Sequence, residues 1–387
     1  MMPQRRYFSF RREGQILTRL CEKQAGLSDT VDIHWSLAFT NSTFAGEFVE
    51  SLVQTLYLCP MIAGLSFSRN ADWMNMRDVE GDIDGEDGGL LANLAGSLPP
   101  WVSCLTFDNV LYDRDLKALV VIIDTMGKLS SGDEGSLSEE STGSAISIRQ
   151  NQGKFKFIGV RNSPHITKDS WISFISMLGK SGASKRVMKS MPLSSLTILD
   201  LSGNKLGDEI AATILELVHD KDSGCNLEQL DLSGNIIGRG TNMVRVLRAY
   251  TEYYRYNQKL GVKMIKSTWK SSLHTLLLAD NDLCLGQAGL EILALLKHNA
   301  LCLRFLDLSN NGLEGDIYQL MASSVLRNTS LCHLDLSGNK FRAQLIDRII
   351  EQLNGEDTDC SLSFLLLESN NPPLSNHQRV ELGKFLR

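Results

Sequence analysis

The chain has 387 residues, a formal net charge of −6 and a hydrophobic fraction of 43%, which is ample for a large folded core. Its negative charge argues against a dedicated nucleic-acid-binding protein, and no stretch approaches the roughly 20 apolar residues of a membrane span. Length alone predicts two or three domains.

Residues 1–30 precede the first clear pattern, and we interpret them as an N-terminal helical cap or as the end of a preceding repeat. Arg5 and Arg6 are followed by no apolar run, so we expect no secretory signal. The eight cysteines are scattered, which favours free thiols in a reducing compartment. We therefore expect a cytoplasmic, intracellular protein.

Short apolar phrases that end in Asn recur between residues 31 and 190. They are Leu37–Asn41, Ile62–Asn70, Leu105–Asn109 and Ile158–Asn162. In all but the second phrase the Asn comes one residue early, which we interpret as a shortened turn after a strand. Helical spacing of apolar residues follows over 44–58, 113–126 and 170–178. These are degenerate strand–helix repeats; a separate α/β domain over residues 1–190 is the alternative.

Two stretches interrupt these repeats. Residues 71–89 are acidic and rich in Gly, but a calcium loop would place Leu91 where a bidentate Glu is needed, so a solvated loop is favoured. Residues 129–153 are rich in Ser, Gly and Glu and are expected to be disordered. Ser131 and Ser136 each have Glu three residues on, which makes them hypothetical sites for an acid-directed kinase.

Sequence motifs for catalysis are weak. Gly179-Lys180-Ser181 resembles the end of a phosphate-binding loop, but Phe174 occupies the position that must be Gly. There is no HExxH or GxSxG sequence and no pair of histidines at metal-ligand spacing. We therefore expect no enzymatic activity, no cofactor and no metal site.

Residues 191–387 repeat the phrase Leu-x-x-Leu-x-Leu-x-x-Asn. The copies begin at Leu196, Leu227, Leu273, Leu303, Leu331 and Leu362 and end at Asn204, Asn235, Asn281, Asn311, Asn339 and Asn370. In a strand the fourth and sixth positions face the same side, so stacked copies predict a Leu core. The Asn amide both donates and accepts hydrogen bonds, so the ninth positions predict an Asn ladder. Apolar residues at helical spacing after Asn204 predict a helix in each repeat.

This phrase strongly resembles that of the leucine-rich repeat family, and the long period with a helical return is similar to the ribonuclease-inhibitor-like subclass. With the degenerate phrases, the resemblance implies about ten repeats in an α/β leucine-rich repeat solenoid (horseshoe). Its parallel sheet would line the concave face and its helices the convex face.

Solenoids mostly present surfaces to partners, so the resemblance implies a non-catalytic scaffold for protein–protein interaction. One alternative is a regulator of a small GTPase, because the Ran GTPase-activating protein has a similar fold. Its acidic C-terminal tail is missing here, and its catalytic residues match no motif of this chain. A cytoskeletal regulator is another alternative, similar to the regulators of actin capping protein or to the tropomodulins.

The fifth position of each phrase is expected to face solvent. It is occupied by Asp200, Asp231, Leu277, Asp307, Asp335 and Leu366. These acids either form a stripe for a basic partner or are family consensus and bond to neighbouring Ser residues or water. Phe305 and Phe364, at the third position, are candidate anchors because aromatic residues are enriched at binding hot spots.

Residues 248–271 interrupt the regular repeats with basic and aromatic side chains. The candidate binding residues are Tyr253, Tyr254, Arg255, Tyr256, Lys259, Lys263 and Trp269. This mixture suits an acidic protein, RNA or an anionic membrane. The alternative is an extended helix whose Tyr residues pack on the next repeat.

After the last phrase, Ser375 is a good N-cap for a short helix through Val380, Leu382 and Phe385. The edge of the last strand is then exposed, covered by this helix, or paired end-on with a partner.

Overall fold

The computed structural model describes a large part of the chain. The described residues are 35–40, 48–59, 62–68, 91, 94, 97–99, 101–113, 115–130, 156–179, 196–219, 225–259, 272–284, 287–297, 303–314, 328–341, 346–347, 350–351, 361–370 and 373–382. The chain divides into two compact units, Met1–Thr197 (unit 1) and Ile198–Arg387 (unit 2).

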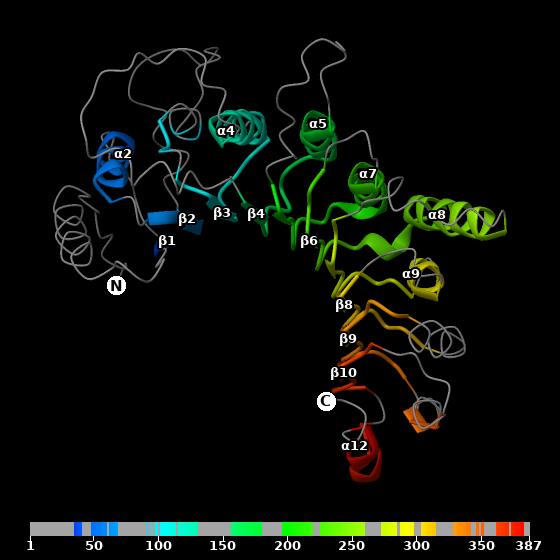
Figure 1. Ribbon diagram of the computed structural model, residues 1–387. Helices are drawn as coiled ribbons and strands as arrows, with labels where there is room; N and C mark the ends of the chain where they lie inside the picture. Colours follow the sequence, from blue (N-terminus) through cyan, green and yellow to red (C-terminus); the bar gives the residue numbers. More distant parts are fainter. Residues whose placement is uncertain are drawn as a thin grey trace. The chain divides into compact units, whose positions relative to one another are not determined.

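Ten parallel strands follow one another in sequence order from β1 to β10. In each unit the described helices lie on one side of the strands (Figure 1). The predicted α/β solenoid of strand–helix repeats is therefore confirmed, because the parallel strands follow one another in sequence order in an open sheet.

Unit 1 contains the degenerate repeats. Its elements are β1 (Trp35–Thr40), α2 (Phe48–Leu58), β2 (Ile62–Ser68), β3 (Cys104–Asp108), α4 (Asp115–Ser130), β4 (Phe157–Arg161) and α5 (Lys168–Gly179). The predicted helices are confirmed, with shifted ends. Helix α5 begins two residues earlier than predicted, because the Thr167 hydroxyl accepts a hydrogen bond from the Ser170 amide (3.4 Å) and caps the helix.

A stack of phenyl rings runs through the core of unit 1. Phe67 lies between Phe39 and Phe107, with ring centroids 5.3 and 5.7 Å away, and these three side chains are buried. The register pairs Phe39 with Phe67 and Phe67 with Phe107, so Phe takes the sixth position that Leu takes in the regular phrase.

The turns after β3 and β4 are not shortened, and that interpretation was wrong. Asn109 and Asn162 are exposed and have φ angles of 56° and 49°. They occupy the eighth position, where Gly203 has a φ of 71°, because Asn tolerates the left-handed conformation. The buried ninth position is filled by Val110 and Ser163.

Unit 2 contains the regular repeats. Its elements are β5 (Ile198–Asp200), α7 (Gly207–His219), β6 (Gln229–Asp231), the 3-10 helix η4 (Ile237–Arg239), α8 (Asn242–Lys259), β7 (Thr275–Leu277), α9 (Ala288–Lys297), β8 (Phe305–Asp307), β9 (His333–Asp335), β10 (Phe364–Leu366) and α12 (Asn376–Leu382). The described Leu residues at the first, fourth and sixth positions are buried, apart from half-buried Leu362.

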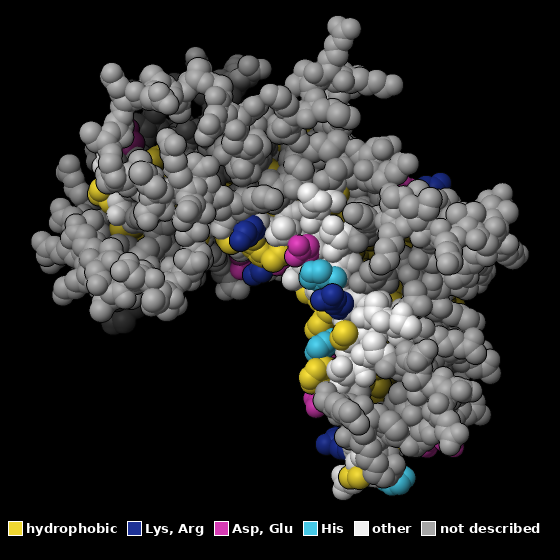
Figure 2. Space-filling view, in the orientation of Figure 1, with side chains coloured by type: hydrophobic (Ala, Val, Ile, Leu, Met, Phe, Trp, Pro, Cys, Tyr) yellow, Lys and Arg dark blue, Asp and Glu magenta, His cyan; other side chains and the backbone are white. Residues whose placement is uncertain are grey.

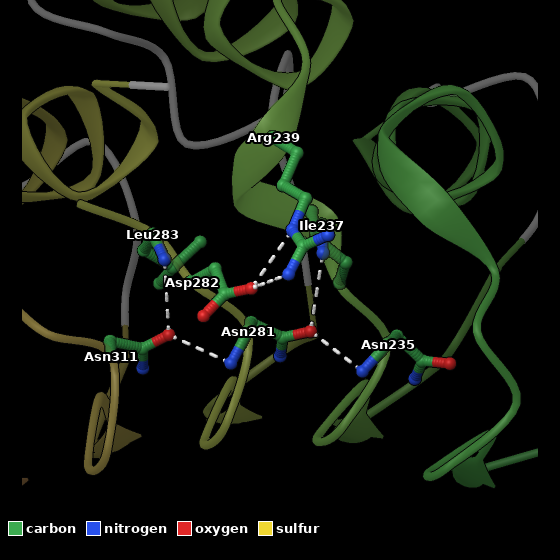
Figure 3. A network of polar contacts seen from close by, with 7 residues as sticks. All are labelled: Asn235, Ile237, Arg239, Asn281, Asp282, Leu283 and Asn311. Carbon is green, nitrogen blue, oxygen red and sulfur yellow. Dashed lines mark hydrogen bonds and ion pairs between the residues drawn. The ribbon is translucent and has the colours of Figure 1, made fainter. Parts of the chain in front are cut away.

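The predicted Asn ladder is present in unit 2 (Figure 3). The Asn235 side-chain oxygen accepts hydrogen bonds from the backbone amides of Asn204 (3.0 Å) and Leu206 (3.2 Å). Its amide nitrogen donates to the carbonyl oxygens of Leu201 and Leu232, both at 2.9 Å. Asn281 repeats the pattern one turn further on, so each Asn joins two successive repeats.

The short C-terminal helix α12 (Asn376–Leu382) is capped by Ser375, as predicted. The Ser375 hydroxyl accepts a hydrogen bond from the Gln378 amide (3.2 Å), and the Gln378 side chain accepts one from the Ser375 amide (2.9 Å). This is a capping box. Gln378 also donates to Asp347 at 2.7 Å, which ties α12 to the preceding repeat.

Candidate functional site

Strands β8, β9 and β10 expose the face of the sheet that points away from the Leu core. Their fourth and sixth positions are buried Leu residues, so the third and fifth positions project to the opposite face. The third positions are Phe305, His333 and Phe364, and the fifth positions are Asp307, Asp335 and Leu366. The parallel register aligns residues of the same position on neighbouring strands.

The third positions form a continuous aromatic stripe, which we define as Phe305, His333 and Phe364. The His333 ring lies 5.5 Å from that of Phe305 and 4.2 Å from that of Phe364, with interplanar angles of 21° and 15°. Parallel stacking of this kind stabilises ring pairs. Phe364 is 50% exposed and Leu366, beside it, is 48% exposed. The stripe therefore ends in an open apolar surface.

In Figure 2, hydrophobic and histidine side chains lie side by side along the strand face of unit 2, with charged side chains beside them. Phe305 and Phe364 were predicted as anchors, but the sequence did not single out His333. Its position could have pointed to it, because His333 stands at the third position of its phrase, as the two Phe residues do in theirs.

The acids at the fifth position hold the turns that follow the strands. Asp231, Asp307 and Asp335 each accept a hydrogen bond from the amide of the Ser two residues on, at 2.9, 2.8 and 2.8 Å. These three acids therefore bond to neighbouring Ser residues, which was one of the two alternatives for the fifth position. One carboxylate oxygen of each makes this bond within the turn.

Asp200 does not face solvent, and that prediction was wrong. Its side chain is buried, and its carboxylate accepts hydrogen bonds from the Ser202 amide (3.0 Å) and hydroxyl (2.8 Å). A carboxylate can be buried where hydrogen bonds satisfy it. Since Leu277 also separates Asp231 from Asp307, the acids do not form a continuous stripe.

Asp307 and Asp335 remain as an acidic pair on adjacent strands. They are aligned in register, on strands about 4.8 Å apart, and both are half-buried. Within the part of the chain that the structure describes, no Lys or Arg side chain pairs with either carboxylate. Each of the two keeps a carboxylate oxygen directed to solvent or to a partner.

Two further charged features flank the same face. Glu228 and His274 approach to 3.5 Å at the second positions of their phrases, and both are well exposed, so this contact contributes little. Arg304, at the second position of the β8 phrase, is exposed. The aromatic stripe therefore has a positive charge before it and the acidic pair after it.

The predicted basic-aromatic insertion begins as part of helix α8. Arg248 donates two hydrogen bonds to Glu291 of α9, at 3.0 and 2.7 Å, and this contact raises the pKa of the guanidinium. Tyr250 donates to the Leu215 carbonyl oxygen of α7 at 3.4 Å. The start of this segment thus bridges neighbouring helices, and the helical alternative is confirmed for the backbone as far as Lys259.

The other candidates of this insertion are not tested. Tyr253, Tyr254, Arg255, Tyr256 and Lys259 belong to α8, but the placement of their side chains lies outside what the structure describes. Lys263 and Trp269 lie wholly outside the described residues. The same holds for the acidic stretch 71–89, for Ser131 and Ser136, and for Lys180 and Ser181. Binding by the insertion stays a prediction.

The described residues contain no group of three or more His, Cys, Asp or Glu side chains that could hold a metal ion. Cys225 and Cys332 are half-buried, and burial raises the pKa of the Cys225 thiol. None of the helices that the structure describes is both long and apolar enough to cross a membrane.

A shallow cavity of about 190 Å³ lies between α4 and α5 and is lined by Asp113, Lys117, Asp169 and Ser170, among others. Asp113 accepts hydrogen bonds from the Thr167 amide (2.7 Å) and hydroxyl (3.0 Å). Burial alone would raise the pKa of Asp113, but these bonds and one from Ser170 hold it below its ordinary value. The carboxylate of Asp113 therefore stabilises the turn at the start of α5.

Two comparisons with known proteins gave matches. Models of leucine-rich repeats match residues 193–215 and 302–323. Among solved structures, the chain is similar to TLR13 in complex with ssRNA13, at 15% identity and a TM-score of 0.33, over 87% of this chain and 44% of that one. The chain thus spans less than half the length of that TLR13 chain.

Two other solved structures are similar over most of their length. The internalin InlF of Listeria monocytogenes str. 4b F2365 has 13% identity and a TM-score of 0.31, over 96% of this chain and 92% of that one. The Rad7–Elc1 complex of yeast has 14% identity and a TM-score of 0.31, over 92% and 88%. No curated protein matches the sequence.

Proposed function

We propose that this chain, a leucine-rich repeat protein, is a non-catalytic binding module that holds a partner protein on the exposed face of strands β8 to β10. The proposal includes membership of the ribonuclease-inhibitor-like subclass, because the repeats are long and return through helices. The part of the chain that makes contact is the aromatic stripe together with Leu366.

The observation that carries the proposal is the exposure of Phe364 and Leu366 at the end of a stack of rings. Large apolar side chains that are contiguous and exposed mark interaction sites more often than isolated ones do. Aromatic residues lose little conformational entropy on binding and are enriched among hot spots. An apolar face of this kind is stabilised when a partner removes it from water.

The frame behind this face is rigid, which suits a binding surface. The Asn311 side chain accepts hydrogen bonds from the amides of Asn281 (2.9 Å) and Leu283 (3.3 Å). Asn339 does the same for Asn311 and Leu313. Because the ladder fixes the spacing of the strands, the rings on their other face are held before a partner arrives.

The test is site-specific photo-crosslinking in the full chain. A p-benzoylphenylalanine at position 364 is expected to form a discrete crosslink to a partner protein, and one at position 58 is not. Leu58, at the end of α2, is the matched control because it is 64% exposed.

The Phe305→Ala/Phe364→Ala pair tests the same site by truncation. We expect recovery of the crosslinked partner to fall by about thirtyfold, as for the loss of a hot spot worth about 2 kcal/mol. The control pair Tyr57→Ala/Leu58→Ala removes exposed apolar side chains from unit 1 and should recover the partner normally. Equal recovery of every partner by both pairs would reject the proposal.

We also propose a cytoplasmic location, on the basis of the scattered cysteines. Fluorescence microscopy of the tagged full chain, together with thiol labelling of Cys225 and Cys332, tests it. Secretion of the protein with blocked thiols would contradict it.

A further inference from the structure

We infer, building on the function proposed above, that the partner inserts a Lys or Arg side chain between Asp307 and Asp335 and places an apolar side chain on the aromatic stripe. The partner is thus a protein segment with a basic residue next to an apolar one. The inference names the chemistry of the partner that the exposed face of β8 to β10 accepts.

The acidic pair has unused capacity for a cation. One oxygen of Asp307 accepts the Ser309 amide and one oxygen of Asp335 accepts the Ser337 amide, both at 2.8 Å. The two carboxylates are aligned on neighbouring strands, where like charges repel each other. A Lys or Arg head group between them relieves this repulsion, and because it carries only donors it can donate a hydrogen bond to each carboxylate.

Two acids elsewhere in unit 2, Asp282 and Glu291, have an Arg partner within the chain. Asp282 pairs with Arg239 at 2.8 Å (Figure 3), and Glu291 pairs with Arg248 at 2.7 Å. These pairs lie at the turns and helices rather than on the strand face. On the strand face, by contrast, the described residues leave the acidic pair without a Lys or Arg.

The aromatic stripe makes a basic side chain the best fit. On each strand the ring and the carboxylate are two residues apart, about 7 Å along the chain. The aliphatic part of a Lys or Arg side chain packs on the Phe305 and His333 rings while its charged end reaches the carboxylates. Exposed Arg304, on the far side of the stripe, repels a second basic residue and so sets the direction of the bound segment.

Asp231 provides a matched control within the same sheet. It occupies the same position and bonds to the Ser233 amide at 2.9 Å, and its neighbours across the sheet are buried Asp200 on one side and Leu277 on the other. The third position of its strand is Gln229 instead of an aromatic ring. Asp231→Asn therefore alters the same kind of turn away from the stripe and removes one of the two charges that the Asn pair removes.

The test begins with random dodecapeptides displayed on phage and selected on the immobilised full chain. The enriched sequences are expected to share a Lys or Arg within two residues of an apolar side chain. A fluorescein-labelled synthetic peptide of this consensus then reports binding by fluorescence anisotropy. The Asp307→Asn/Asp335→Asn pair should bind it about tenfold more weakly and with less dependence on salt.

The Asn substitutions keep an oxygen that accepts the Ser309 and Ser337 amides, so the turns are expected to stay intact. Asp231→Asn should bind the peptide as the unchanged chain does. Exchange of charge is the most stringent test. The Asp307→Lys/Asp335→Lys variant should not bind the basic peptide, but it should bind the same peptide with Glu in place of its basic residue.

Three results would overturn the inference: a consensus without a basic residue, equal binding by the Asn pair, or enrichment of no peptide. Binding of a labelled single-stranded oligonucleotide to the stripe would also overturn it, because the acidic pair repels phosphate. Loss of binding in Phe305→Ala/Phe364→Ala with no effect of the Asn pair would leave the proposed function standing and reject only the basic partner.

Discussion

Units 1 and 2 build the same turn after a strand with different side chains. In unit 2, buried Asn residues at the ninth position join successive repeats. In unit 1 the described ninth positions are Val110 and Ser163, and the Ser163 hydroxyl donates to the Arg161 carbonyl oxygen at 3.1 Å. The turn therefore does not require Asn.

The strands of the two units also differ in length. Those of unit 1 have five to seven residues, whereas each strand of unit 2 has three. Past the end of a short strand the backbone still pairs with the next repeat, as Leu201 does with Asp231 and Gly203 with Ser233, at 2.9 and 2.8 Å. The Asn side chains bind the amides that follow in the turn, because unpaired buried groups are costly. The ladder therefore stabilises the turns of unit 2, whereas the phenyl stack fills the core of unit 1.

The largest expected effect is in the phenyl stack. Phe67→Ala removes a fully buried ring between two others and should lower the free energy of unfolding by about 4 kcal/mol. Hydrogen exchange read strand by strand should show the loss of protection in β2 and β3. Phe364→Ala is the control, since this ring is half exposed; a similar loss there would show that the stack is not special.

The ladder should come next. Asn281→Ala leaves the amides of Asn235 and Ile237 without their acceptor and removes one of the two donors to the Leu232 carbonyl oxygen, at a cost of about 3 kcal/mol. Ser163→Ala, at the same position in unit 1, should cost about 1 kcal/mol. Denaturant titration of both variants checks the order, and equal losses would contradict the special role of the ladder in unit 2.

A smaller effect is expected at the left-handed eighth position of unit 1. Asn109→Ala should destabilise the chain by about 1 kcal/mol, because its φ is 56°. Asn109→Gly should be close to neutral, since Gly adopts this conformation without strain. Thermal unfolding of the two variants separates strain from loss of the side chain. If Gly is as harmful as Ala, the Asn side chain itself stabilises the turn.

The smallest effect concerns pH. The pKa of Asp113 is lower in the folded state than its ordinary value, so the folded state binds fewer protons and stability rises with pH. This contribution is present above about pH 4 and is lost as the pH falls through the folded-state pKa. Since Asp113 is largely solvated, Asp113→Asn should cost under about 1 kcal/mol at pH 7.

Thermal unfolding between pH 2.5 and 7 measures the Asp113 effect, and Asp169→Asn, on the same cavity, is the control. An Asp113→Asn curve parallel to that of the unchanged chain would contradict the assignment.

The sequence predicted the two Phe anchors of the candidate site but not the His residue between them. Phe305 and Phe364 stand at the third position of a known phrase, where a strand side chain must face away from the core. His333 stands there too, but a single His in a surface position indicates nothing by itself. Only the alignment of β8, β9 and β10 shows that its ring fills the space between the two Phe rings.

The sequence also could not predict which of the acids is buried, because burial depends on the neighbouring strands. Asp200 and Asp335 occupy identical positions in nearly identical phrases, yet one is buried and the other half-buried. Both accept a hydrogen bond from the amide of the Ser two residues on, so the phrase does not distinguish them. What differs is the set of side chains that surround each carboxylate.

By itself the sequence determined the repeat, its Leu core and its Asn ladder, because these follow from the period of two along a strand and from the hydrogen bonds that a turn leaves open. The tertiary structure decided which exposed side chains meet. Register between strands brings residues about thirty positions apart into contact, as it does for Phe305 and His333, and no local pattern encodes that contact.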